Sequence, residues 1–375
     1  MRVIGILSSA LVCLTVGCAS PPAAAEEEPN LSAMIDSLFV AYDVGKRPGY
    51  AIGVVHQGEL AFAKGYGLAD IESETSISPD TAFNIASLSK QFTAAAIAKE
   101  IVETDLALSD KLSEHWPDLP KEYGQIEIGH LVYMTSGLPE YYSLPSPKGG
   151  WASEDQFAVD DAIAAVWKAR ALEYAPGTRW SYSNINYQLL AEIAARRHST
   201  SFAERMQTAF FKPLGMTHTW VDAPIQVDRP ERATSYQWRT EAMGWVEAPR
   251  LSPHYGGSGM FSSLRDLAKW DAALYRDKAF GEAFSAQMLA TKEYGHDKTN
   301  DAFGLVYGSY RGLETIWYEG GDYGVSAYMV RIPERDQTVI CLSNIGNSGC
   351  LSKAQAVMDV LIAFDEDADF VRDGN

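Results

Sequence analysis

The sequence predicts a mixed α/β fold of the α+β type, in which both chain ends contribute to one antiparallel sheet and a mainly helical region is inserted between them. Two strand-like runs, 50–56 and 59–66, lie near the start of the chain. Three more runs lie near the end, at 317–318, 326–332 and 337–342. Between the two groups, apolar residues recur at helical spacing, so helices are expected to flank the sheet.

The elements follow one another without a visible internal repeat. Residues 31–44 have helical spacing, and Gln57-Gly58 between the first two strand runs predicts a tight hairpin. A helix is expected to begin near Ser87, and further helices are expected at 156–169, 187–197, 202–211, 263–274 and 351–364. The run from Ser263 to Asp266 is similar to a capping box that opens one of them.

The chain is long and apolar enough to bury a large core, with 375 residues of which 46% are hydrophobic. We expect one folded domain over 31–366 and a frayed acidic tail at 367–375. The α/β part of this domain combines 31–90 with 255–366, and its mainly helical part is 91–254.

The formal net charge of -18 argues against nucleic acid or an anionic membrane surface as a partner. The seven histidines and four cysteines show no zinc-like spacing, so no metal or other cofactor is expected. A small-molecule or peptide partner remains, and the oligomeric state is left open.

The N-terminus predicts export. Arg2 precedes an apolar run that is too short to span a bilayer, which is typical of a signal peptide over 1–17. Gly17-Cys18 at its end resembles the lipobox of bacterial lipoproteins, in which the cysteine is lipidated; cleavage by ordinary signal peptidase is the alternative. Residues 18–30 form a proline-bearing tether that we expect to be disordered. The protein is expected in the periplasm or anchored to the outer membrane.

Cys341 and Cys350 are the cysteines of the predicted folded domain. Export would permit a disulfide between them. Cys341 lies in an apolar strand run, where a buried free thiol is ordinary, and this second interpretation is favoured.

Ser87-x-x-Lys90 is the first motif with chemical potential. Its two side chains share one face of a helix start, where backbone N–H groups point toward any anion that forms. A lysine in a partly dry pocket can take the serine proton or lower the pKa of another base. By itself the motif also fits a capped helix with a solvated lysine.

Tyr182-x-Asn184 is the second motif, and it is expected on a loop. The phenol can shuttle a proton, and the amide can hold the lysine or a substrate carbonyl. Taken alone, an asparagine that caps the following helix is the simpler interpretation.

Together the two motifs resemble the serine β-lactamase and penicillin-binding superfamily, in its class C β-lactamase-like branch. That branch also holds D,D-peptidases, D-aminopeptidases and carboxylesterases. Further stretches that resemble it are Ile126–Leu131, Thr135–Pro139, Phe211–Met216, Gly257–Gly259, Asp266, Leu267 and Trp270. The resemblance covers most of 31–365 and implies a β-lactamase/transpeptidase-like fold.

The resemblance also implies site roles. Ser87 would be the acylated nucleophile, Lys90 and Tyr182 the proton-transfer pair, and Asn184 a positioning residue. The third family element, Lys-Thr-Gly or His-x-Gly, is matched at Glu319-Gly320-Gly321, which implies an oxyanion hole from the backbone N–H groups of Ser87 and Asp322.

Glu319 departs from the family pattern because a carboxylate stands where the family has a basic residue. In that position it would oppose a substrate carboxylate, which β-lactams and the D-alanyl ends of peptidoglycan carry. The alternatives are that Glu319 turns to solvent or that the match is off by one residue. Tyr141, Tyr142 and Trp151 could form aromatic walls of the pocket or simply pack within their own loop.

The sequence therefore predicts an exported serine hydrolase of esters or amides, most similar to a carboxylesterase. A D-aminopeptidase, or a peptidoglycan D,D-peptidase or β-lactamase, is the alternative within the same chemistry. A catalytically weakened binding protein of the same fold is the alternative from another class.

Overall fold

A computed structural model describes residues 30–152, 154–291, 293–294, 297–298 and 301–364. The predicted signal peptide, Cys18, nearly all of the predicted tether and the acidic tail lie outside the described residues.

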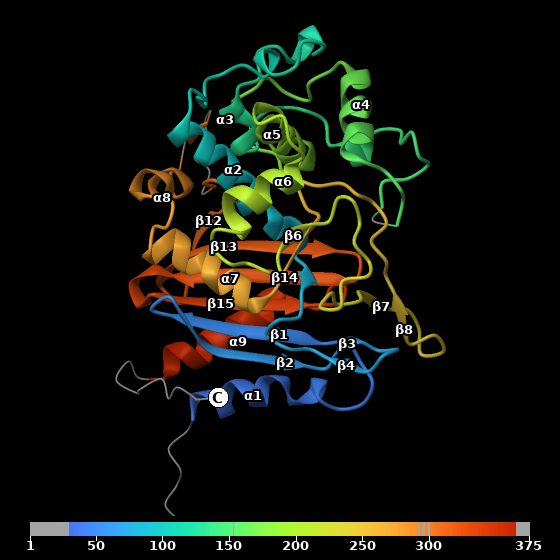
Figure 1. Cartoon of the computed structure of the whole chain (residues 1–375), viewed down its shortest axis with the longest axis vertical. Helices are drawn as coiled ribbons and strands as arrows, with labels where there is room; N and C mark the ends of the chain where they lie inside the picture. The colour runs from blue at the N-terminus through green and yellow to red at the C-terminus, as the bar shows by residue number, and fades with distance from the viewer. Residues whose placement is uncertain (1–29, 153, 292, 295–296, 299–300, 365–375) are drawn as a thin grey trace, which may run out of the picture.

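One six-stranded antiparallel sheet joins the two ends of the chain (Figure 1). Its strands, in spatial order, are β12 Val306–Tyr310, β13 Leu313–Asp322, β14 Val325–Ile332, β15 Gln337–Ser343, β1 Tyr50–His56 and β2 Glu59–Tyr66. The central pairing of β1 with β15 runs from Tyr50 opposite Ser343 to His56 opposite Gln337. This topology confirms the predicted sheet; β12 and the full length of β13 were not predicted.

Smaller sheets surround it. They are β5 Phe83–Asn84 with β9 Met260–Ser262 and β6 Trp220–Val221, β3 Leu68–Asp70 with β4 Thr75–Ser76, β7 Tyr236–Trp238 with β8 Trp245–Glu247, and β10 Glu293–Tyr294 with β11 Asp297–Lys298.

The helices lie on both sides of the main sheet. They are α1 Leu31–Phe39, α2 Lys90–Glu103, α3 Ile128–Val132, α4 Val159–Ala169, α5 Asn184–Arg197, α6 Phe202–Met206, α7 Leu264–Asp271, α8 Glu282–Met288 and α9 Cys350–Ala363. Short 3-10 turns are η1 Val40–Tyr42, η2 Ala86–Ser89, η3 Leu112–Glu114, η4 Lys121–Tyr123, η5 Tyr141–Ser143 and η8 Pro333–Arg335, and π-type turns are η6 Gln207–Phe211 and η7 Ala272–Arg276. Several predicted helices are therefore split, because their last turn has a different hydrogen-bond pattern.

The sheet separates two apolar cores, because side chains of successive strand residues point to opposite faces. On one face α1 and α9 cover a core that includes Ile52, Val330 and Cys341. On the other face α7 packs on β1, β2 and β15, and η2 packs on β13 and β14. Figure 1 shows the helices from the middle of the chain above the sheet and α1 below it. The Ser87 motif therefore lies between the sheet and the helical region.

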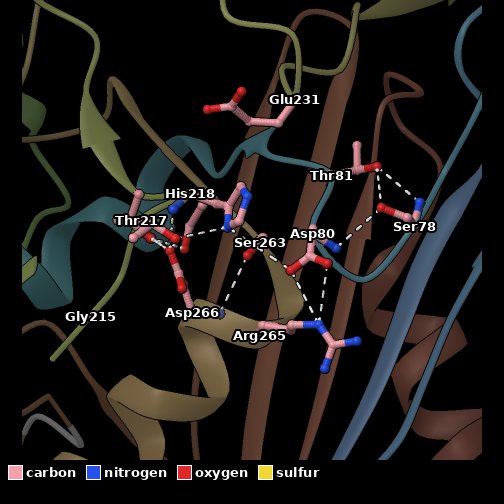
Figure 2. A network of polar contacts seen from close by, with 12 residues as sticks. Ser78, Asp80, Thr81, Gly215, Thr217, His218, Glu231, Ser263, Arg265 and Asp266 are labelled. Atoms are coloured by element: carbon pink, nitrogen blue, oxygen red, sulfur yellow. Dashed lines mark hydrogen bonds and ion pairs between the residues drawn. The ribbon is translucent and has the colours of Figure 1, made fainter. Parts of the chain in front are cut away.

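Buried Asp266, one of the residues on which the family resemblance rests, is part of a network of polar contacts at the start of α7 (Figure 2). Asp266 lies in the first turn of α7, and Ser263 caps that helix by accepting a hydrogen bond from Asp266 N at 3.3 Å. The Asp266 carboxylate accepts hydrogen bonds from His218 N at 2.7 Å and Thr219 Oγ1 at 2.9 Å. It thereby holds the chain after Gly215 against α7, and Lys269 Nζ at 2.9 Å from Asp266 Oδ1 offsets its charge.

Both cysteines of the described domain are buried free thiols. Cys341 lies in β15, and Cys350 is the first residue of α9 and donates to Ser326 O at 3.4 Å. Among the described helices, none has the length and apolar character that crossing a membrane requires.

Candidate active site

Ser87 lies in the sharp turn that connects a short strand to α2. The turn begins at Ala86, whose φ of 44° is in the left-handed region that non-glycine residues rarely adopt. Asn84 supports this conformation because its Oδ1 accepts a hydrogen bond from Ala86 N at 2.9 Å. Ser87 is therefore in the 3-10 turn η2, just before the helix start at Lys90.

Lys90 is fully buried and its ammonium has three oxygen partners. Lys90 Nζ donates to Ser87 Oγ at 3.1 Å, to Asn184 Oδ1 at 2.8 Å and to the carbonyl of Gly257 at 2.5 Å. All three are neutral, so the amine is held in place without a direct carboxylate partner.

Tyr182 completes the group around the serine. Its Oη lies 2.8 Å from Ser87 Oγ and 3.4 Å from Asn184 Oδ1, and Lys90 Nζ lies 4.8 Å from the centre of its ring. The structure thus brings together all four residues of the two motifs. A proton that leaves Ser87 Oγ has Tyr182 Oη within hydrogen-bond reach as its acceptor, and Lys90 lies beside both oxygens, which is the arrangement that nucleophilic catalysis requires.

Asn184 is the first residue of α5, three residues before the predicted start of that helix. Its backbone N–H donates to Glu140 Oε2 at 2.5 Å. Glu140 Oε1 is buried and has no hydrogen-bond partner among the described residues. Burial raises the pKa of Glu140, and the hydrogen bond from Asn184 and the charge of Lys90 offset part of that rise. Nothing in the local sequence around Glu140 indicates this role, which depends on a contact across the fold.

The loop 256–259 forms the floor under Lys90. Gly257 supplies the carbonyl oxygen that Lys90 contacts, and Gly256 O accepts from Thr93 Oγ1 at 2.8 Å. Gly256 has a φ of 88°, and a Cβ there would lie 2.4 Å from the carbonyl oxygen of Tyr187. The loop can therefore approach α5 this closely only with glycine at that position.

The structure corrects the expected position of Glu319. Tyr318 and Gly320 face Ser87: a Cβ on Gly320 would lie 2.2 Å from Ile85 O, next to η2. Glu319 is exposed on the opposite face, beside Tyr328 of β14. Because side chains alternate along a strand, the family element is shifted by one residue, and Tyr318 takes the place expected for Glu319.

The phenol at that place is uncharged. Burial raises the pKa of Tyr318 well above its ordinary value, and the neighbouring Tyr182 adds to the rise. Tyr318 can donate a hydrogen bond, but it cannot supply the positive charge that the family motif would supply.

The same register favours Gly321 over Asp322 as an oxyanion donor. Asp322 pairs with Val325 across a two-residue turn, so its N–H points toward β14. The N–H of Gly321 then points the other way, to the edge of β13 that the described part of β12 leaves open beyond Trp317. That edge faces the cavity beside Ser87.

A cavity of about 650 Å³ opens beside Ser87. Aromatic residues of its wall include Trp180, Tyr187 and Tyr318, and its carboxylates are Asp301 and Glu319. No Lys, Arg or His side chain is among the described residues that line it. Burial raises the pKa of Asp301 to about 6, against a hydrogen bond that it accepts from the Trp180 indole.

The aromatic residues of the 141–151 loop pack on one another and are not among the described lining residues. The Tyr141 and Trp151 rings lie 5.0 Å apart, and Tyr142 lies 4.2 Å from Tyr141. Their own packing is therefore the interpretation that the structure supports. In the described part of the chain, no group of three or more His, Cys, Asp or Glu side chains could hold a metal ion.

Comparison with known proteins gives a family and several relatives. The model of the family described as Beta-lactamase matches residues 35–359. A D-aminopeptidase of Gluconobacter oxydans is 25% identical over 84% of this chain and 59% of its own length. A beta-lactamase of Escherichia coli is 30% identical over 69% of this chain and 64% of its own.

The solved structure of D-amino acid amidase from Ochrobactrum anthropi, complexed with D-phenylalanine, has a TM-score of 0.74. It is 21% identical and aligns with 88% of this chain and 99% of its own. This likeness confirms the predicted fold class. The chain spans roughly 60% of the length of the curated relatives that it matches.

Proposed function

The chain belongs to the Beta-lactamase family of serine hydrolases, and from this premise we propose that it cleaves esters or amides through an acyl-enzyme on Ser87. The observation that carries the proposal is that Ser87 Oγ lies 2.8 Å from Tyr182 Oη and 3.1 Å from Lys90 Nζ. A hydroxyl with a phenol oxygen and a lysine amine at these distances is placed to lose its proton and attack a carbonyl carbon.

In the first step, Ser87 Oγ bonds to the substrate carbonyl carbon, and its proton passes to the Tyr182–Lys90 pair. The N–H groups of Ser87 and Gly321 bind the oxyanion; each such donor is typically worth about 3 kcal/mol. The same pair then protonates the leaving alcohol or amine. In the second step, water gives a proton to the pair while its oxygen bonds to the acyl carbon; the bond from Ser87 Oγ to that carbon then breaks, the pair returns the proton to Ser87 Oγ, and the acid leaves.

The charge of the cavity favours neutral substrates. Asp301 and Glu319 are acidic, and the described lining contributes no cation that could hold a substrate carboxylate. We therefore infer a carboxylesterase-like preference over β-lactams and D-alanyl peptides. Tyr318, which takes the place of the basic residue of the family motif, supplies no positive charge, and Glu319 adds a carboxylate to the lining.

A D-aminopeptidase or D-amino acid amidase is the second candidate. Asp301 supports it, because a half-buried carboxylate in the cavity can pair with a substrate ammonium. Relatives with such names, among them the Gluconobacter oxydans protein, support it as well. Export and a lipid anchor at Cys18 remain part of the proposal, since a small residue before a cysteine ends the predicted signal peptide.

The deciding experiment is intact-mass analysis after labelling with a fluorophosphonate, with Ser87→Ala as the control. One adduct on the wild-type protein and none on the variant is expected. Turnover of p-nitrophenyl butyrate and of D-alanine p-nitroanilide then separates the two candidates. No adduct together with no turnover of either compound would contradict the proposal and favour a binding protein of the same fold.

A further inference from the structure

A second cavity lies on the face of the sheet that is turned away from Ser87. It has a volume of about 280 Å³ and is bounded by β12, β13 and β14 on one side and α9 on the other. We call it the back groove. Its larger side chains are Tyr310, Trp317, Tyr328, Val330, Leu351 and Met358. The Trp317 and Tyr328 rings stack with centres 5.8 Å apart, so the groove has a flat aromatic floor.

The back groove adjoins the cavity of Ser87. Trp317, Glu319 and Leu351 line both of them. Gly320 and Gly321, which follow Glu319 on β13, line the Ser87 cavity. A Cβ on Gly321 would have no atom within 4 Å, so the space next to this residue is open.

We propose that the back groove is a subsite for an extended apolar arm of the substrate whose carbonyl Ser87 attacks. The inference rests on the proposed function and adds a substrate class to it: esters or amides with a long, neutral or cationic acyl group. The shared lining identifies the occupant, because a substrate arm that extends from the Ser87 cavity past Trp317, Glu319 and Leu351 reaches the groove.

The side chains that line the back groove determine which kind of substrate arm can bind there. The groove buries methylene or ring carbons against aromatic and aliphatic side chains, and each buried methylene strengthens binding by about fourfold. Glu319 is the only charged side chain among the described residues of the groove, and it also lines the Ser87 cavity. An arm with a carboxylate would meet a like charge there and is disfavoured.

A substitution at Gln355 can fill the back groove without filling the Ser87 cavity. It lines the back groove and is not among the described residues of the Ser87 cavity. Gln355→Trp would fill the space with a bulky ring. Ser352→Trp is the matched control, because Ser352 is exposed on the same helix and lines neither cavity in the described structure. Gln355→Phe replaces the first variant if it does not fold.

The experiment measures kcat/KM for the p-nitrophenyl esters of acetate, hexanoate and dodecanoate with each protein. We expect the wild-type protein and Ser352→Trp to prefer the longest ester, and Gln355→Trp to lose about tenfold on that ester while it keeps acetate turnover. Glu319→Gln should increase turnover of a dodecanedioate half-ester about fivefold, an effect of the size known for exposed charge pairs. Glu314→Gln on the same strand is its control.

A Gln355→Trp protein that kept the chain-length preference of the wild type would overturn the inference, as would a wild type without any such preference. If no ester were hydrolysed at all, the proposed function would fail separately. Calorimetric binding of octylamine to the same proteins would then decide the subsite: weaker binding by Gln355→Trp alone supports it, and equal binding by all of them refutes it.

Discussion

Replacing either of two adjacent glycines with alanine should have opposite consequences, which tests the register of β13. Gly320 faces the turn that carries Ser87, whereas Gly321 faces open space. We expect Gly320→Ala to lose most of its activity and Gly321→Ala to keep it. Gly321 donates through its backbone N–H in the proposed mechanism, and alanine retains that group.

The magnitude follows from the contact distances. A Cβ on Gly320 would lie 2.2 Å from Ile85 O and 3.1 Å from Leu88 N, and ordinary contacts begin at 3.4 Å. Both partners are backbone atoms, so the strand and the Ser87 turn must separate by about 1 Å. A displacement of this size at reacting groups costs roughly 100-fold in rate. Crowding of this kind costs about 1–3 kcal/mol in the free energy of unfolding.

The assay is kcat/KM for p-nitrophenyl butyrate, combined with urea unfolding of the wild type and both variants. Gly320→Ala with nearly normal activity would refute the inference that Gly320 and Tyr318 face Ser87. A severe loss in Gly321→Ala would have the same meaning, because it would place that residue against the turn instead. Loss in Gly320→Ala alone supports the structural register.

Three further outcomes are expected. Burial raises the pKa of Glu140, so the folded protein holds a proton that the unfolded chain releases, and stability falls as pH rises from the ordinary carboxyl pKa through the raised value. Glu140→Gln should therefore flatten the pH dependence of urea unfolding. It should also lower kcat by about tenfold, since the hydrogen bond from Asn184 N loses its charged acceptor. A variant whose unfolding keeps the wild-type pH profile would contradict this reasoning. For an ammonium substrate such as D-alanine p-nitroanilide, kcat/KM should rise as pH increases through about 6, where Asp301 ionises. Asp301→Asn should remove the rise and leave p-nitrophenyl butyrate turnover unchanged, whereas a rise that persists would assign it to another group. Cys18→Ser should release the protein from the membrane fraction after cell lysis, and a variant that stays in that fraction would exclude a lipid anchor at Cys18.

Much of the fold could be predicted because its strands have local signals. The runs that became β1, β2, β14 and β15 are dense in β-branched and aromatic residues, and Gln57-Gly58 is a recognisable hairpin turn. β12 escaped prediction because Val306–Tyr310 contains glycine and serine and is an edge strand stabilised by its pairing with β13. Such pairing across the fold leaves little trace in the local pattern.

The candidate site also contains residues that the sequence indicates and residues that only the structure shows. Ser87, Lys90, Tyr182 and Asn184 could be identified because each pair lies within a few residues of sequence. Glu140 reaches the site only through tertiary contact with the N–H of Asn184. A backbone carbonyl such as that of Gly257 is equally invisible to a motif, because any residue could supply it.

The predicted position of the third motif differs from the structural one by one residue, for a physical reason. Glu319-Gly320-Gly321 contains two glycines in succession, so the spacing alone allows either glycine to face the serine. The contact with Ile85 shows that Gly320 is the glycine that faces the serine. A Cβ on Gly320 would lie 2.2 Å from Ile85 O, so only a residue without a Cβ fits there. The charge that the sequence appeared to place beside Ser87 therefore stands on the opposite face of β13.

With this one-residue shift, one face of β13 serves catalysis and the other face serves substrate specificity. The face of β13 toward Ser87 carries Tyr318 and Gly320, which provide a neutral donor and close backbone approach. The opposite face carries Trp317 and Glu319, which line the back groove. Because the residues alternate, substitutions on the second face can alter the choice of acyl group without moving the nucleophile. Substitutions at Trp317 and Glu319 should therefore change the choice of substrate, while Tyr318 and Gly320 are constrained by their position next to Ser87.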